Sequence, residues 1–141
     1  MKQEKSCGAV IFYKENAIIY YLLIQYQLNH NYWGFVKGHV EGSETEKETA
    51  VREIKEEVGL SDLSFIEKFR FVHSYKSNPT TNKQVVFFLA KSTTKTVLLS
   101  PSEVKDSVWL PFEGSMKRLS YNNDRELLSI ANETLLQNIQ I

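Results

Sequence analysis

A chain of 141 residues has the length of one ordinary domain, and its 42% hydrophobic residues are enough to fill one core. Lys plus Arg and Asp plus Glu both number 17, so no overall field attracts nucleic acid or an anionic membrane. Any affinity for phosphate groups must come from a local cluster of basic residues. We therefore expect a single domain over residues 1–141 that binds neither nucleic acid nor membranes.

The cysteine content and the lengths of the apolar runs indicate the cellular compartment of the protein. The only cysteine, Cys7, lies in the apolar run SCGAVIF, which excludes an intramolecular disulfide and a zinc site built from several cysteines. Its simplest role is that of a small core residue. The N-terminus lacks a secretory pattern, and no apolar stretch approaches the roughly 20 residues that a spanning helix needs. These features predict a soluble, cytoplasmic protein.

The first predicted elements are two buried strands, residues 7–12 and 18–24. Both are short apolar runs rich in β-branched and aromatic residues, and the polar turn 14–16 separates them. Residues 32–36 then lead into a glycine-containing loop over residues 37–43.

The clearest predicted helix follows this loop. Gly59 stands where a C-terminal cap belongs, and two overlapping candidates for an N-terminal capping box precede the helix, Ser43-x-x-Glu46 and Thr45-x-x-Glu48. Its apolar residues recur at helical spacing: Ala50, Val51, Ile54 and Val58.

The second half of the chain predicts more strands and one more helix. Residues 63–74 and 84–90 are predicted strands on either side of 76–82, a polar segment that we expect to be a long mobile connection. Residues 108–110 form another short strand, and an amphipathic helix begins near Asn123. The apolar face of that helix comprises Leu127, Leu128, Ala131, Leu135 and Ile139. This order implies an α/β sandwich with a mixed β-sheet between helices.

The central helix carries three acids that share one side. Glu53, Glu56 and Glu57 stand at positions i, i+3 and i+4, so their carboxylates project within a single turn. The adjoining side is apolar, so the acids should lie at the edge of the core, where their mutual repulsion is costly. A hard divalent cation such as magnesium would relieve that repulsion. The fragment REIKEE alone fits a solvated charged face better than a metal site.

The surroundings of this fragment favour the metal site. Residues 38–60 read GHVEGSETEKETAVREIKEEVGL and match every specified position of the signature GX5EX7REUXEEXGU, where U is a bulky aliphatic residue. On these residues the chain resembles the Nudix hydrolase family. The resemblance implies a Nudix-type α/β/α sandwich and an enzyme that hydrolyses phosphoanhydride bonds.

The same resemblance implies roles within the box. Glu53, Glu56 and Glu57 would hold the catalytic cations, which are magnesium or, as a substitute, manganese. The backbone carbonyl of Gly38 would be a further ligand, and Arg52 would fix the rotamer of a glutamate. Bound cations neutralise charge that grows on phosphate oxygens and lower the pKa of a bound water.

Residues around the box resemble one branch of the family, the asymmetric diadenosine tetraphosphate hydrolases. Trp33 followed by KGHVE (37–41) is close to the W-x-x-P-K-G-H-V-E of that branch, although Val36 replaces the proline. By this resemblance, Lys37 and His39 would contact phosphate oxygens.

Three further residues extend the resemblance beyond the box. Tyr75 would stack on an adenine, and Lys83, before the strand QVVFFLA, would bind the phosphate chain. Glu103, six residues ahead of Trp109, matches a glutamate that the branch places near the metals, where it would be a ligand or the general base. Tyr121 is either the second face of an adenine sandwich or a residue that covers the core.

The resulting hypothesis is hydrolysis of diadenosine tetraphosphate to ATP and AMP by a monomer or weak dimer. Other substrates found in the family remain alternatives: oxidised deoxynucleoside triphosphates, ADP-ribose and the 5′-triphosphate of RNA. An alternative of another class is a catalytically silent sensor that binds a nucleotide, for which a damaged box would be expected.

Overall fold

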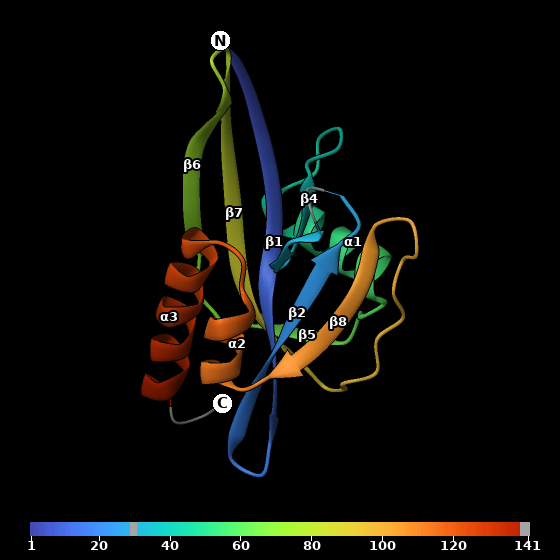
Figure 1. Cartoon of the computed structure of the whole chain (residues 1–141), viewed down its shortest axis with the longest axis vertical. Coiled ribbons are helices and arrows are strands. Elements are labelled where there is room, and N and C mark those ends of the chain that lie inside the picture. Colours follow the sequence, from blue (N-terminus) through green and yellow to red (C-terminus); the bar gives the residue numbers. More distant parts are fainter. Residues whose placement is uncertain (29–30, 139–141) are drawn as a thin grey trace.

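A computed structural model describes residues 1–28 and 31–138, which form one mixed β-sheet with helices on both faces (Figure 1). The strands are β1 (Lys2–Glu15), β2 (Ile18–Tyr26), β3 (Trp33–Gly34), β4 (Val36–His39), β5 (Leu63–Phe65), β6 (Phe71–Asn78), β7 (Thr81–Ser92) and β8 (Val104–Leu110). The helices are α1 (Glu46–Val58), α2 (Phe112–Arg118) and α3 (Asn122–Gln137). The predicted sandwich is confirmed; Ile139, expected in its last helix, lies outside the described residues.

Strand β1 is the centre of the sheet. It pairs with β7 in parallel, from Lys2 opposite Thr81 to Phe12 opposite Lys91, and with β2 and β4 in antiparallel orientation. Strands β5 and β6 pair with β7, while β3 and β8 pair with β2. Because a parallel pair needs a long crossover, the chain between β1 and β7 is free to place β4 and α1 beside β1.

Alternate residues of β1 face two separate cores. Val10 and Phe12 belong to the cluster that includes Leu127 and Leu128 of α3. Ala9 and Ile11 belong to the cluster that includes Ile54 and Val58 of α1. Successive strand residues point to opposite faces, so a strand covered on both faces becomes an uninterrupted apolar run. This explains why the run at residues 7–12 signalled a buried strand.

Helix α1 is fixed at both ends by its own sequence. Thr45 is the N-cap, its hydroxyl accepts from the Glu48 amide at 3.1 Å, and the Glu48 carboxylate accepts from the Thr45 amide at 2.8 Å. The second of the two predicted capping boxes is therefore the one that forms. Gly59 adopts φ 71° and donates to the Lys55 carbonyl, as a left-handed C-cap does. Val51, included in the apolar pattern, is instead exposed.

The predicted mobile connection at residues 76–82 is wrong. These residues form the tip of a β-hairpin, in which Lys76 pairs with Asn82 and Asn78 with Thr81. The Asn78 side chain accepts from the amide and the hydroxyl of Thr80, which closes the turn. The tip is polar because most of it is exposed, and Figure 1 shows the hairpin extending past the helices. These residues therefore pair as strands although their sequence lacks the alternation of apolar and polar residues that predicts a strand.

Other parts of the sequence prediction also differ from the structure, and β1 and β8 are longer than the predicted strands 7–12 and 108–110. Residues 37–39, assigned to a loop, complete β4 and pair with β1. The predicted strand 63–74 is divided into β5 and β6, with a turn near Lys68 at φ 68° between them. Helix α2 was not predicted, because its seven residues are too few to show a helical period.

Replacing Thr45 by Ala should lower the free energy of unfolding by about 1 kcal/mol, because the amide of Glu48 loses its acceptor. Urea unfolding followed by circular dichroism measures this change. Ser43→Ala is the matched control, since Ser43 belongs to the rejected capping box and should leave stability within about 0.5 kcal/mol of wild type. Equal losses in both variants would refute the capping assignment.

Candidate functional site

Three glutamates from two segments meet at the edge of the α1-side core. Glu53, Glu57 and Glu103 each offer a carboxylate oxygen, and these oxygens lie within 4.8 Å of one another. Glu53 is 8% exposed and Glu57 only 2%, whereas Glu103 is exposed. The cluster therefore has two buried acids and one that reaches it from the surface.

Glu103 reaches the cluster because the segment between β7 and β8 is held by backbone hydrogen bonds. The Ser100 amide donates to the Glu57 carbonyl at 3.0 Å, and the Glu103 carbonyl accepts from the Gln27 amide at 2.9 Å. The Gln27 side chain also donates to the Pro101 carbonyl at 3.1 Å. The end of α1 and the end of β2 thus position this segment from both sides.

Gly38 allows β4 to approach the cluster closely. A Cβ atom at this position would lie 2.0 Å from the Glu53 carboxyl carbon, so any larger residue would displace this carboxylate. The Glu53 carboxylate occupies the space that a larger residue would fill. This close approach gives a physical reason for glycine at the first position of the box.

Arg52 joins the loop before α1 to the acids on it. Its guanidinium donates to both carboxylate oxygens of Glu44, at 2.7 and 3.0 Å, and to Glu53 at 2.8 Å. It also donates to the His39 carbonyl at 2.9 Å and to Glu56 at 3.2 Å. Only the planar fork of arginine satisfies this set of acceptors, since lysine has one nitrogen.

Glu56 does not lie at the core edge as the sequence analysis expected. Its side chain is 54% exposed and contacts Arg52, and it is not among the three clustered acids. The reason is helical geometry: at 3.6 residues per turn, Glu57 lies next to the apolar stripe of α1, Glu53 lies further round, and Glu56 is farthest.

Burial makes the charge on Glu57 costly. Desolvation, followed by the hydrogen bond and charge of Glu53 and the charge of Glu103, raises the pKa of Glu57 to about 9, although Tyr26 acts in the opposite direction. The Tyr26 hydroxyl donates a hydrogen bond to Glu57 Oε1 at 3.0 Å and accepts one from the Lys37 amide at 3.1 Å. Tyr26 therefore connects the acidic cluster to β4.

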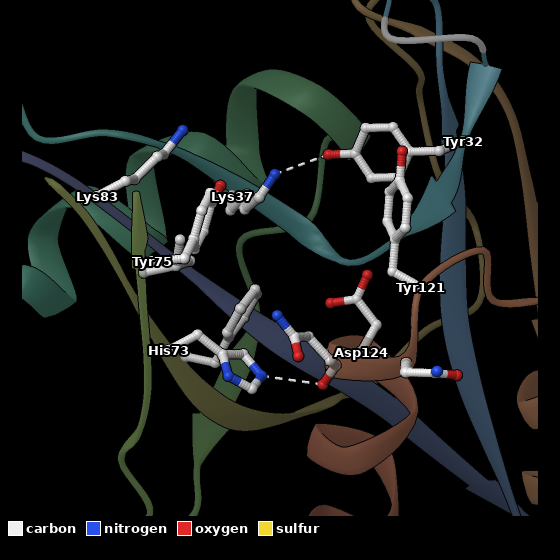
Figure 2. Close-up of a pocket in the computed structure, with 11 residues that line it drawn as sticks. Tyr32, Lys37, His73, Tyr75, Lys83, Tyr121 and Asp124 are labelled. Atoms are coloured by element: carbon white, nitrogen blue, oxygen red, sulfur yellow. Dashed lines mark hydrogen bonds between the residues drawn. The ribbon is translucent and has the colours of Figure 1, made fainter. Parts of the chain in front are cut away.

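A pocket of about 630 Å³ is lined by Lys37 of β4, the residue whose amide bonds to Tyr26. Figure 2 shows its labelled side chains, with Tyr75 and Tyr121 on opposite walls. The lining comes from the residue before β3, from β4, β6 and β7, and from the start of α3: Tyr32, Lys37, His73, Tyr75, Lys83, Val85, Phe87, Tyr121, Asn122, Asn123 and Asp124.

Two lysines give the pocket its positive charge. Lys37 Nζ donates to the Tyr32 hydroxyl at 2.7 Å and lies over the rings of Tyr26 and Tyr32. Burial, and then the charge of Lys37, lower the pKa of Lys83. Two cations that face one space favour an anionic ligand, although the Asp124 carboxylate lines the same pocket.

The pocket collects four of the five substrate-binding residues expected from the sequence. Lys37, Tyr75, Lys83 and Tyr121 line it, while His39 is exposed and does not. Sequence reasoning missed Tyr26, Tyr32, His73 and Asp124. Only the tyrosines carried a signal, as aromatic residues close to the box, because the other two converge through the sheet and α3.

The comparisons with known proteins agree with this geometry. The family model for the NUDIX domain matches residues 2–129. This chain therefore belongs to the NUDIX family of hydrolases, which confirms the family inferred from residues 38–60.

Three relatives illustrate the range within the family. The asymmetrical bis(5′-nucleosyl)-tetraphosphatase of Mus musculus is 36% identical over 95 residues, which cover 62% of this chain and 64% of that protein. The 8-oxo-(d)GTP phosphatase of Mycolicibacterium smegmatis is 36% identical over 97 residues, 68% of this chain and 29% of that protein. A binary complex of the C. elegans Ap4A hydrolase superimposes with a TM-score of 0.88 at 30% identity, covering 96% of this chain and 99% of the other.

Within the described ranges, none of the helices combines the length and the hydropathy that spanning a bilayer requires.

Replacing Glu44 by Gln should flatten the acid side of the stability profile. The Arg52 hydrogen bonds lower the pKa of Glu44 from 4.5 to about 2, so this carboxylate contributes stability above pH 4.5 that is lost as the pH falls toward 2. Urea unfolding at a series of pH values should give a smaller slope in that window for the variant. The difference should be modest and should shrink in high salt, because Glu44 is solvent-accessible.

Glu41→Gln is the matched control for this change. Glu41 lies in the same loop, but its side chain is 70% exposed and 3.7 Å from Arg52. An equal flattening in Glu41→Gln would show that the Arg52–Glu44 pair is not the cause.

Proposed function

We propose that this protein is a magnesium-dependent pyrophosphohydrolase that splits diadenosine tetraphosphate into ATP and AMP. The observation that carries the proposal is the position of the buried acidic cluster beside a pocket with two lysines and exposed tyrosines. Tyr26 contacts both, since it bonds to Glu57 and to the backbone of Lys37. We also propose that residues 1–141 act as a single domain, because one sheet unites strands from β1 to β8.

The acidic cluster fits a divalent cation. Glu53 and Glu57 bring two buried carboxylates together, and among the described residues Arg52 is the cationic side chain that contacts the pair, through Glu53 Oε1. Oxygen donors of this kind suit magnesium, which also keeps waters and bridges to substrate phosphates. Glu53, Glu57 and Glu103 would hold the ion, with the Gly38 carbonyl on the adjacent strand as a further donor. Glu56 would join them as a ligand only by leaving Arg52.

A bound cation would supply positive charge to the phosphate oxygens and acidify a water. Side chains of the protein would orient the carboxylates and accept the proton. Arg52 holds the Glu53 carboxylate in one rotamer, and Tyr26 holds that of Glu57. Glu103, the exposed member of the cluster, would accept a proton from an attacking water if it does not hold the ion.

The pocket offers groups that suit phosphates and groups that suit bases. Lys37 and Lys83 would bind the phosphate chain, whereas His39 does not line the pocket. Tyr75 and Tyr121 are exposed aromatic rings on opposite walls, and such rings stack well on nucleobases. A dinucleoside polyphosphate offers both kinds of group.

The relatives favour this substrate without excluding others. The C. elegans enzyme that superimposes over nearly the whole chain is named an Ap4A hydrolase, and the mouse relative is named a tetraphosphatase. A relative named as an 8-oxo-(d)GTP phosphatase keeps oxidised nucleotides as an alternative. All acids of the box are present, which argues against a sensor that only binds.

Replacing Glu57 by Gln should reduce kcat on the order of 100- to 1,000-fold, because a group that supports charge stabilisation in the transition state is lost. The variant should also lose the rise in melting temperature that magnesium gives the wild type. Both are measured at matched ionic strength. Glu133→Gln on the exposed side of α3 is the control and should behave as wild type. A Glu57 variant with undiminished turnover would refute the metal site.

The substrate proposal is tested by incubating the protein with magnesium and, separately, diadenosine tetraphosphate, ADP-ribose, 8-oxo-dGTP and triphosphorylated RNA. ATP plus AMP should form fastest, and Lys83→Ala should raise KM for the dinucleotide about tenfold or more, because a charge-assisted contact is lost. Lys76→Ala is the matched control from the same hairpin, outside the pocket lining. Faster cleavage of another compound would replace the substrate and keep the chemistry.

A further inference from the structure

Asp124 is a pocket residue with no role in the chemistry described above. It lies in the first turn of α3, three residues after Tyr121, and lines the pocket. Figure 2 shows its carboxylate directed into the space between Tyr75 and Tyr121. Burial raises the pKa of Asp124, although Lys37, His73 and Arg125 act in the opposite direction.

The three residues whose charges act on Asp124 all make hydrogen bonds to other groups. Lys37 donates to the Tyr32 hydroxyl, His73 Nε2 lies 2.9 Å from the Asn123 carbonyl, and Arg125 binds the carbonyls of Met116 and Leu119 and the Asn122 side chain. Among residues 1–28 and 31–138, none donates a hydrogen bond to the Asp124 carboxylate. A partly buried acid without a donor is costly unless a ligand supplies one.

Gly34 leaves the space in which this carboxylate sits. A Cβ atom at Gly34 would lie 3.2 Å from Asp124 Oδ2 and 3.0 Å from the Tyr32 ring. The acid therefore packs over the backbone of β3, beside the Tyr32 ring, which in turn contacts Tyr121 at a centroid distance of 5.2 Å. This packing holds the carboxylate in place at the aromatic end of the pocket.

The chemistry of the pocket indicates which part of a ligand meets Asp124. A carboxylate repels phosphate, and the two lysines already offer the phosphates a favourable position. The remaining donors of a nucleotide are the amino group of the base and the ribose hydroxyls. A base stacked on Tyr121 would turn its edge toward Asp124, which lies on the same helical turn. The amino group of the base is therefore favoured over the ribose hydroxyls as the donor.

We propose that Asp124 determines base specificity by accepting a hydrogen bond from the 6-amino group of an adenine ring in this pocket. One carboxylate oxygen accepts in either charge state, so the amino group is the required partner. The inference rests on the proposed function in assuming that the pocket holds a nucleotide, but it concerns binding and not hydrolysis.

The test is calorimetric titration of the protein with AMP and with purine riboside 5′-monophosphate, which differs only by lacking the 6-amino group. Magnesium is omitted so that no turnover occurs. Wild type should bind AMP about tenfold or more tightly than the analogue, because an acceptor with charge is left unpaired in the second complex. Asp124→Leu, similar in size, should bind both equally.

Asp124→Asn should keep the preference, because its carbonyl oxygen still accepts. Glu126→Ala, on the same helix but outside the pocket lining, controls for local changes in α3. Equal binding of the two ligands by wild type would overturn the inference, as would a preference that survives in Asp124→Leu. A selective loss for 2′-deoxy-AMP that disappears in Asp124→Leu would assign the acid to ribose and would also overturn it.

These outcomes separate the inference from the proposed function. If AMP is preferred but no substrate is hydrolysed, the proposed hydrolysis fails and the role of Asp124 stands. If hydrolysis occurs and wild type does not distinguish the two ligands, the reverse holds. The comparison in wild type remains decisive even if Asp124→Leu does not fold.

Discussion

The site depends on holding two carboxylates, Glu53 and Glu57, in a largely dry position next to each other. Their repulsion opposes folding, and the rest of the structure compensates for it. Helix α1 is capped at both ends and packs its apolar stripe on β1, Arg52 neutralises the outer acid, and Tyr26 donates to the inner one. Two buried carboxylates held side by side favour a ligand of opposite charge.

Helix α1 also explains why the acidic cluster could largely be predicted from the sequence. The positions of the box correspond to local requirements that one sequence segment satisfies: glycine where Glu53 approaches β4, arginine that reaches back to Glu44, and glycine at the C-cap. Helical periodicity also placed Glu57 beside the core. It did not separate Glu56 from the other two acids, because spacing alone does not say which side of a charged face the core covers.

The pocket was only partly predictable for a physical reason. Tyr75 and Lys83 could be named through resemblance, but the segment between them looked mobile because its strands are polar and exposed. Asp124 and His73 carry no local pattern, since they meet only through the pairing of β6 with β7 and the packing of α3. Contacts between distant segments are set by topology, which composition and periodicity do not encode.

The β6–β7 hairpin has one further consequence. Tyr75 and Lys83 are directly opposite each other across the two strands, so the group that would stack on a base and the group that would hold a phosphate are separated by a fixed cross-strand spacing. Side chains alternate between faces, so a slip of one residue in pairing would turn Tyr75 away from the pocket. The turn closed by Asn78 thus helps to fix the relative position of these two side chains, and changes in its length would alter that position.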